Sequence, residues 1–157
     1  MLGGGVITLP LLFLLVIFGF LLAIRKFFLK DKLSFSFVGR ASLAVMLTVT
    51  GIAHFTNADL MIEMMPEFVP MKREMVYFTG VCELLAVVGL LWDKTSKLTA
   101  VMLIIFFIAI LPANIIGSMK QVQLGGMENG VIYLFFRIPL QILFILWTYY
   151  FGIRINK

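Results

Sequence analysis

The chain contains five hydrophobic stretches, and each is about as long as a helix needs to be to cross a lipid bilayer. They cover residues 5–24, 40–57, 76–92, 98–118 and 131–151. Hydrophobic residues make up 62% of the 157-residue chain and charged residues only 13%, which is too few to cover the surface of a soluble domain. The sequence therefore predicts an all-α membrane protein in which these stretches form a transmembrane helical bundle.

The first stretch could be a secretory signal or an uncleaved anchor. No basic segment precedes it and no Ala-x-Ala cleavage site follows it, whereas Arg25 and Lys26 come directly after it. This pattern favours an anchor. We expect residues 1–39 to form an N-terminal transmembrane anchor with a basic cytoplasmic loop, outside the polar core, and residues 40–157 to form a four-helix transmembrane domain.

The positions of the basic residues predict the orientation in the membrane. Three connections on one side hold nine Lys and Arg residues and the other side holds three, namely Lys72, Arg73 and Lys120. The nine are Arg25, Lys26, Lys30, Lys32, Arg40, Lys94, Lys97, Arg154 and Lys157. Because Lys and Arg accumulate on the cytoplasmic side, we expect a multi-pass protein of the cell membrane with its N-terminus outside and its C-terminus in the cytoplasm. The net charge of +5 is explained by this clustering, so it does not indicate binding to nucleic acid.

Two ionisable residues lie inside the hydrophobic stretches. Glu83 is seven residues into the third stretch and Arg137 six residues into the fifth. Both stretches start from the same side, so the helical rise places the two charges at similar depths of about 10 and 9 Å. A charge at membrane depth costs at least a few kcal/mol unless it is paired or used. We therefore predict that Glu83 and Arg137 form a direct ion pair.

Other polar residues fall at the same level. His54 lies near the end of the second stretch, Asn114 near the end of the fourth and Gln141 one turn after Arg137. Pro112 and Pro139 each remove a backbone donor, and the freed carbonyls need partners. We expect both prolines to face protein or a cavity rather than lipid.

Three interpretations of this polar cluster remain open. It could be a structural pair that pins two helices, a pocket for a quinone or another small redox substrate, or a proton path. We predict a binding pocket, because His54, Asn114 and Gln141 would be left over once Glu83 and Arg137 had paired. These five residues are the candidate cofactor-binding residues.

Metal, thiol and nucleophilic chemistry have weaker support. Cys82 is the only cysteine, so the chain has no Cys-x-x-Cys pair, and His54 is the only histidine, which excludes a bis-histidine haem. Segment 58–75 carries the methionines Met61, Met64, Met65, Met71 and Met75, which indicate either a Cu(I) site or apolar packing. We predict apolar packing and no metal site, and no catalytic residue is assigned. We expect this segment to lie in the membrane interface or to fold back over the bundle.

The sequence resembles the DoxX-like (DoxX/MauE-type) membrane protein family. The matching motifs lie between residues 40 and 151 and are Gly51–Phe55, Met65–Pro70, Val76–Leu84, Pro112–Asn114, Arg137–Gln141 and Trp147. The resemblance implies a four-helix membrane bundle of the bacterial cytoplasmic membrane, to which the first stretch adds one extra N-terminal transmembrane helix.

The resemblance also implies a role. Some DoxX relatives are subunits of thiosulfate:quinone oxidoreductase, and others are linked to oxidative-stress and thiol-redox complexes. We expect a quinone-interacting or redox-associated membrane subunit with a quinone as its cofactor and other membrane redox subunits as its partners. The alternative is a non-catalytic scaffold or partner subunit of an envelope complex. Enzyme activity and oligomeric state stay open.

Overall fold

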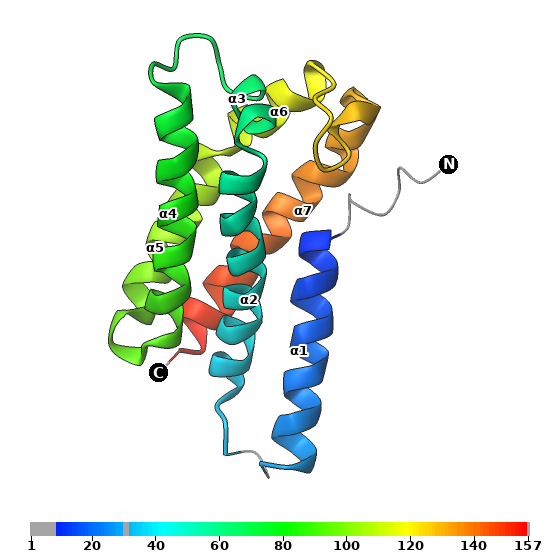
Figure 1. Ribbon diagram of the computed structural model, residues 1–157. Coiled ribbons are helices and arrows are strands. Elements are labelled where there is room, and N and C mark those ends of the chain that lie inside the picture. The colour runs from blue at the N-terminus through cyan, green and yellow to red at the C-terminus, as the bar shows by residue number, and fades with distance from the viewer. Residues whose placement is uncertain (1–8, 30–31, 157) are drawn as a thin grey trace.

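The computed structural model describes residues 9–29 and 32–156, and every regular element among them is a helix (Figure 1). The helices are α1 (Leu9–Phe27), α2 (Phe35–Thr56), α3 (Ala58–Glu63), α4 (Lys72–Leu91), α5 (Asp93–Ala109), α6 (Leu111–Met119) and α7 (Val131–Tyr149). A short 3₁₀ turn, η1 (Met127–Asn129), precedes α7, and a π-turn, η2 (Tyr150–Arg154), continues it. The basic residues Lys30 and Lys157 lie outside the described residues.

Five helical segments are long and apolar enough to cross a membrane, which agrees with the predicted all-helical membrane protein. They are α1, α2, α4, α5 with α6, and α7 with η2. Three helices begin earlier than the sequence prediction: α2 at Phe35 rather than at residue 40, α4 at Lys72 rather than at residue 76, and α5 at Asp93 rather than at residue 98. The first turns of α4 and α5 are polar, whereas α2 begins with the apolar residues Phe35 and Phe37 on either side of Ser36. The side chain of Ser34 caps α2 by accepting a hydrogen bond from Phe37 N at 3.0 Å.

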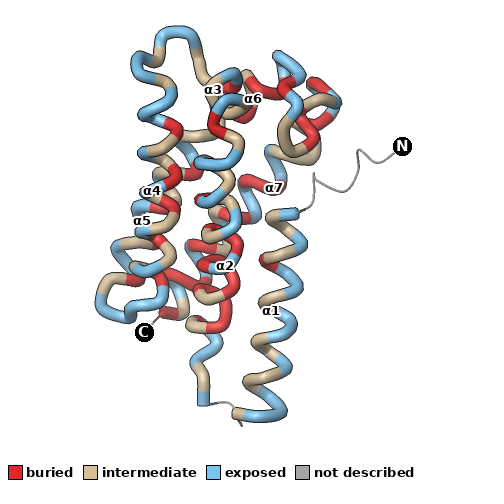
Figure 2. Tube along the Cα trace, viewed as in Figure 1, coloured by how far each residue is buried: buried red, intermediate tan, exposed pale blue. Residues whose placement is uncertain are grey.

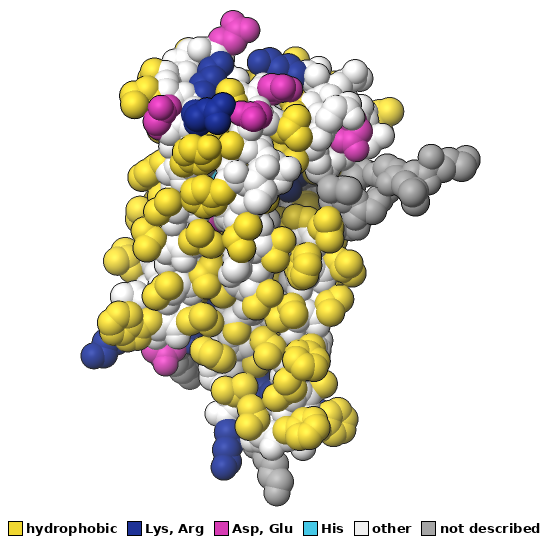
Figure 3. Space-filling model, viewed as in Figure 1, with side chains coloured by type: hydrophobic (Ala, Val, Ile, Leu, Met, Phe, Trp, Pro, Cys, Tyr) yellow, Lys and Arg dark blue, Asp and Glu magenta, His cyan; other side chains and the backbone are white. Residues whose placement is uncertain are grey.

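The surface agrees with a lipid environment. On the face shown in Figure 3, hydrophobic side chains form a broad band and the charged side chains gather at the two ends of the long axis. Large apolar residues of the helices, such as Phe20, Leu85 and Ile105, are more than half exposed. In water such a surface would drive aggregation, whereas in a bilayer it faces acyl chains.

Helix α2 is the most buried helix of the bundle and packs against α1, α4 and η2 (Figure 2). Its contact with α4 is close because Gly80 faces it: a Cβ on Gly80 would lie only 2.7 Å from the Cβ of His54. Small residues at such positions let membrane helices approach one another. The approach brings the polar residues of α2 and α4 together.

Helices α5 and α6 form one span with a break at Ile110. Pro112 is in the first turn of α6, where a proline is tolerated, and the residue Ile110 ends α5 and begins α6. The interruption coincides with the backbone donor that Pro112 lacks. Pro139, in contrast, lies within the continuous helix α7. Both prolines are exposed, so the expectation that they face protein or a cavity is wrong for Pro112, whereas Pro139 lines an apolar hollow that opens on the surface.

The first part of segment 58–75 folds back over the bundle, which was one of the two expected arrangements. Phe68 and Met71, in the loop that follows, are 85% and 70% exposed, and residues 72–75 belong to α4. The short helix α3 and the turn after it cover the end of the bundle that also carries α6 and η1, hereafter the α3–α6 end (Figure 1). Met64 is buried there in an apolar cluster with Val122, Met127 and Tyr133.

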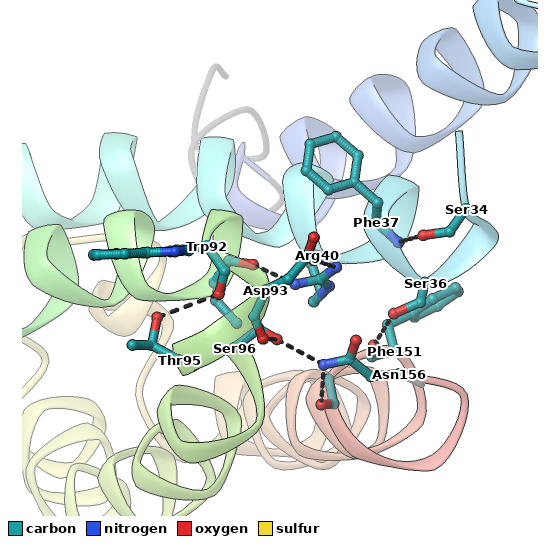
Figure 4. A network of polar contacts seen from close by, with 12 residues as sticks. Ser34, Ser36, Phe37, Arg40, Trp92, Asp93, Thr95, Ser96, Phe151 and Asn156 are labelled. Atoms are coloured by element: carbon teal, nitrogen blue, oxygen red, sulfur yellow. Dashed lines mark hydrogen bonds and ion pairs between the residues drawn. The ribbon is translucent and has the colours of Figure 1, made fainter. Parts of the chain in front are cut away.

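A polar network closes the opposite end of the bundle (Figure 4). The Arg40 guanidinium donates to the Leu90 carbonyl at 2.9 Å and to Asp93 at 2.6 Å, which ties α2 to the turn between α4 and α5. Asn156 donates to Ser96 at 2.7 Å and so fixes the C-terminal segment against α5. These contacts join α2, α4, α5 and the C-terminal segment at the end of the bundle opposite the α3–α6 end.

Candidate functional site

A cavity of about 360 Å³ lies within the α3–α6 end, among α2, α4, α6 and α7. All five candidate residues from the sequence line it: His54, Glu83, Asn114, Arg137 and Gln141. The structure therefore brings four separate helices together at one level. The rest of the wall is mainly apolar, which together with a few convergent polar groups is typical of small-molecule sites.

Glu83 is held by a residue of the neighbouring helix. It is 4% exposed and lies on the face of α4 that contacts α2. The Thr50 hydroxyl donates a hydrogen bond to Oε2 of Glu83 at 2.5 Å. A buried carboxylate in an apolar bundle needs such a donor, since lipid supplies none.

His54 lies one turn after Thr50 on the same face of α2. Its Nδ1 is 2.9 Å from the Thr50 carbonyl oxygen. Because a carbonyl oxygen can only accept, Nδ1 must carry the proton in this contact. In the neutral ring the other nitrogen, Nε2, is then an acceptor on a residue that lines the cavity.

Asn114 and Arg137 connect α6 to α7. The Asn114 amide donates to the Ile110 carbonyl at 3.2 Å, at the break between α5 and α6, and its Oδ1 accepts a hydrogen bond from Nη2 of Arg137 at 3.1 Å. The Tyr133 phenol lies beside the same guanidinium, one turn earlier on α7. The break thus positions Asn114 to orient Arg137.

Gln141 satisfies a second carbonyl near the break. Its Nε2 donates to the Phe107 carbonyl at 2.7 Å. Leu111, the residue four positions after Phe107, begins a new helix, so the ordinary helical hydrogen bond to this carbonyl is displaced. This contact links α7 to α5 and fixes the side chain of Gln141 at the cavity wall.

Two polar atoms of α7 are left without a partner in the part of the chain that the structure describes. They are Nε of Arg137, a donor, and Oε1 of Gln141, an acceptor, and both are buried. The two residues are four positions apart and therefore lie on one face of α7, at the cavity. A buried polar atom without a partner costs about 1–3 kcal/mol. A molecule that offers one acceptor and one donor can satisfy both.

The predicted ion pair between Glu83 and Arg137 is wrong. Among residues 9–29 and 32–156, the ion pairs are Arg40–Asp93 and Arg73–Asp59. Glu83 and Arg137 line the same cavity and influence each other electrostatically, but their hydrogen-bond partners are Thr50 and Asn114. Equal depth did place the two charges in one site. Depth alone does not fix how each helix is rotated, and polar neighbours on the adjacent helices are the partners instead.

Two further parts of the site were not predicted from the sequence. Thr50 was not assigned to Glu83, although Thr50 and His54 are spaced by four residues and so share a helical face. The first stretch was expected outside the polar core, whereas Leu9 and Pro10 of α1 line the cavity. No sequence signal distinguishes a lipid-facing leucine from a cavity-facing one in a helix that is apolar all round.

Methionines contribute to the wall of the cavity. Met61, Met64 and Met65 line it, whereas Met71 and Met75 are exposed. Such flexible thioether side chains fill irregular apolar space. In the described part of the chain, no group of three or more His, Cys, Asp or Glu side chains is placed to hold a metal ion.

Comparison with known proteins gives a family but no described relative. No curated protein and no solved structure matches the chain. A family model described as "Domain of unknown function (DUF8561)" matches residues 43–152, which include α3 to α7 and most of α2. The match contains all five candidate residues and leaves α1 outside. The chain belongs to the DUF8561 family.

Proposed function

We propose that the cavity binds the ring of a membrane quinone and that the protein is a quinone-interacting subunit of a membrane redox system. The observation that carries this proposal is the pair of buried, unpartnered atoms on α7, Arg137 Nε and Gln141 Oε1. One is a donor and the other an acceptor, and both belong to residues that line one apolar cavity.

The two atoms match the two oxidation states of such a ring. A quinone oxygen accepts a hydrogen bond, which Arg137 Nε can donate, whereas a quinol hydroxyl can also donate, and Gln141 Oε1 can accept. A site with both groups binds both forms. The cavity volume of about 360 Å³ lies in the range of small-molecule sites, and Phe107 and Phe144 supply apolar wall for an aromatic ring.

The remaining polar residues fit the same role. Glu83 balances the charge of Arg137 within the cavity, so that a neutral ring can enter without an uncompensated charge. The acceptor Nε2 of His54 offers a second place for a hydroxyl group. Electrons would come from a partner subunit, since the chain has one cysteine and hence no dithiol of its own.

The resemblance to DoxX-like proteins supports this proposal and also suggests which helices form the core of the bundle. We propose that α2, α4, α5 with α6, and α7 form the four-helix core, with α1 as the added helix. The N-terminus would lie outside the cell membrane and the C-terminus in the cytoplasm, as the distribution of Lys and Arg indicates. The cavity would then lie in the outer half of the bilayer.

The proposal is tested by quinone binding to the full chain in lipid nanodiscs. A ligand that prefers the folded state raises the melting temperature. We expect a benzoquinone and its quinol to raise it, measured for each variant against its own value without ligand. Arg137→Lys keeps the charge but removes the Nε–H, and it should weaken quinone binding by about tenfold or more, the equivalent of one charge-assisted hydrogen bond.

Thr148→Val is the matched control for a second variant, Gln141→Met. Thr148 is also a buried polar residue of α7, but its hydroxyl donates only to the Phe144 carbonyl of the same helix, at 2.7 Å. Gln141→Met should abolish the quinol-dependent shift and Thr148→Val should keep it. If neither ring form shifts the wild-type protein, the quinone proposal fails, and copurifying protein partners would then support the scaffold function.

A further inference from the structure

A second hollow lies beside the cavity and is entirely apolar in its lining. It measures about 200 Å³ and is formed by Leu11 of α1 and by Phe136, Pro139, Leu140 and Leu143 of α7. Pro139 is exposed and Leu143 is 37% exposed, so the hollow opens on the surface that faces lipid. It is a groove between α1 and α7.

The groove and the cavity are neighbours along both helices. On α7, the groove residues Phe136 and Leu140 directly precede the cavity residues Arg137 and Gln141. On α1, Leu11 directly follows Pro10, which lines the cavity. The two spaces therefore occupy adjacent faces of α7 at the same level of the bundle.

The main apolar cluster of the bundle lies next to the groove on α1. Leu14 of α1 is fully buried in the main apolar cluster, together with residues of α2 and α7 such as Leu47 and Phe144. The groove therefore lies on the side of the cavity where α1 and α7 face each other. It offers an apolar tail a surface without a single hydrogen-bonding side chain.

We infer that the groove holds the isoprenoid tail of the quinone whose ring occupies the cavity, and that α1 forms one side of this lateral entrance. The inference rests on the proposed function and makes it narrower: the ligand is a tailed, lipid-soluble quinone. Helix α1, which supplies the second wall of the groove, lies outside the family match at residues 43–152.

The test compares two ligands with the same benzoquinone ring, one without a tail and one with a long isoprenoid tail. Leu143→Trp fills the groove, and Ile142→Trp is its control because Ile142 is on the same helix, half exposed, and outside both spaces. We expect Leu143→Trp to weaken the tailed ligand by about tenfold, the equivalent of about two methylene groups kept from apolar contact. Binding of the tail-less ring should not change in either variant.

A second measurement uses the unaltered protein, so it does not depend on how a variant folds. A tailed quinone with a photoreactive group on the tail should label α1 and α7 at residues 10–14 and 136–143. Labelling confined to other helices, or equal weakening of both ligands by Leu143→Trp, would overturn the lateral entrance and leave ring binding intact. Failure of both ligands to bind the wild-type protein would instead refute the proposed function together with the inference.

Discussion

The hydrogen bond from Thr50 to Glu83 can be removed with little change of shape by replacing Thr50 with valine. The Thr50 hydroxyl has one proton, and its contact with Glu83 Oε2 at 2.5 Å is shorter than its contacts with the Met46 and Leu47 carbonyls, both at 3.3 Å. The carboxylate is 4% exposed, so no solvent replaces the lost donor.

The expected cost follows from the type of bond. A hydrogen bond to a charged group contributes about 1.5–3 kcal/mol, whereas hydrogen bonds between transmembrane helices average about 0.6 kcal/mol. We therefore expect Thr50→Val to lower the free energy of unfolding by about 1.5–3 kcal/mol. In a Glu83→Gln background the acceptor is neutral, and the same substitution should cost only about 0.6 kcal/mol.

Thr48→Val is the matched control. Thr48 lies on the same helix and is half-buried like Thr50, but its hydroxyl donates only to the Ala44 carbonyl of its own helix, at 2.9 Å. We expect it to change stability by no more than about 0.5 kcal/mol. The assay is reversible unfolding in mixed micelles followed by circular dichroism. Equal costs for the two threonines, or strictly additive losses with Glu83→Gln, would show that Thr50 does not hold Glu83.

Three further predictions concern the bundle itself. Gly39→Ala should lower the free energy of unfolding by about 1–3 kcal/mol, because a Cβ there would lie 2.1 Å from the Phe151 ring. Gly19→Ala, which has open surroundings, should raise it by about 0.5–1 kcal/mol. Thermal unfolding of the two variants measures both changes. Arg40→Met should lower the free energy of unfolding by about 1–3 kcal/mol, since it leaves a buried carbonyl of α4 unsatisfied. Asp93→Asn should lower it by less than about 1 kcal/mol, because Asp93 is 83% exposed. A smaller loss of stability for Arg40→Met than for Asp93→Asn would contradict this expectation. A phosphatase fused to the C-terminus should be inactive, because we expect this end of the chain in the cytoplasm. Phosphatase activity outside the membrane would show that the chain has the opposite orientation.

The spans and the level of the polar residues could be predicted because both follow from one-dimensional rules. Apolar length against bilayer thickness gives the five spans. The rise per residue gives the depth of Glu83 and Arg137, which do share one cavity. The break near Pro112 follows from the missing backbone donor.

The partners could not be predicted, because they depend on how the helices rotate and pack. Glu83 binds Thr50 rather than Arg137, since the close contact at Gly80 brings α2 nearest to it. Asn114, which depth alone would leave unpaired, orients Arg137 across the break. The contribution of α1 to the cavity was missed because an all-apolar helix carries no mark of the face that it buries.

The most direct test of the central claim is the identity of the molecules that stay bound to the protein. The full chain and its Arg137→Lys variant are extracted from cell membranes into native nanodiscs, and the small molecules that accompany each are identified by mass spectrometry. We expect the wild-type protein to retain a tailed quinone in equimolar amount, and we expect the Arg137→Lys variant, which lacks the Nε–H that donates to the quinone oxygen, to retain much less than an equimolar amount. A wild-type preparation with no quinone above the background level of the surrounding lipid would contradict the assignment of this cavity to a quinone.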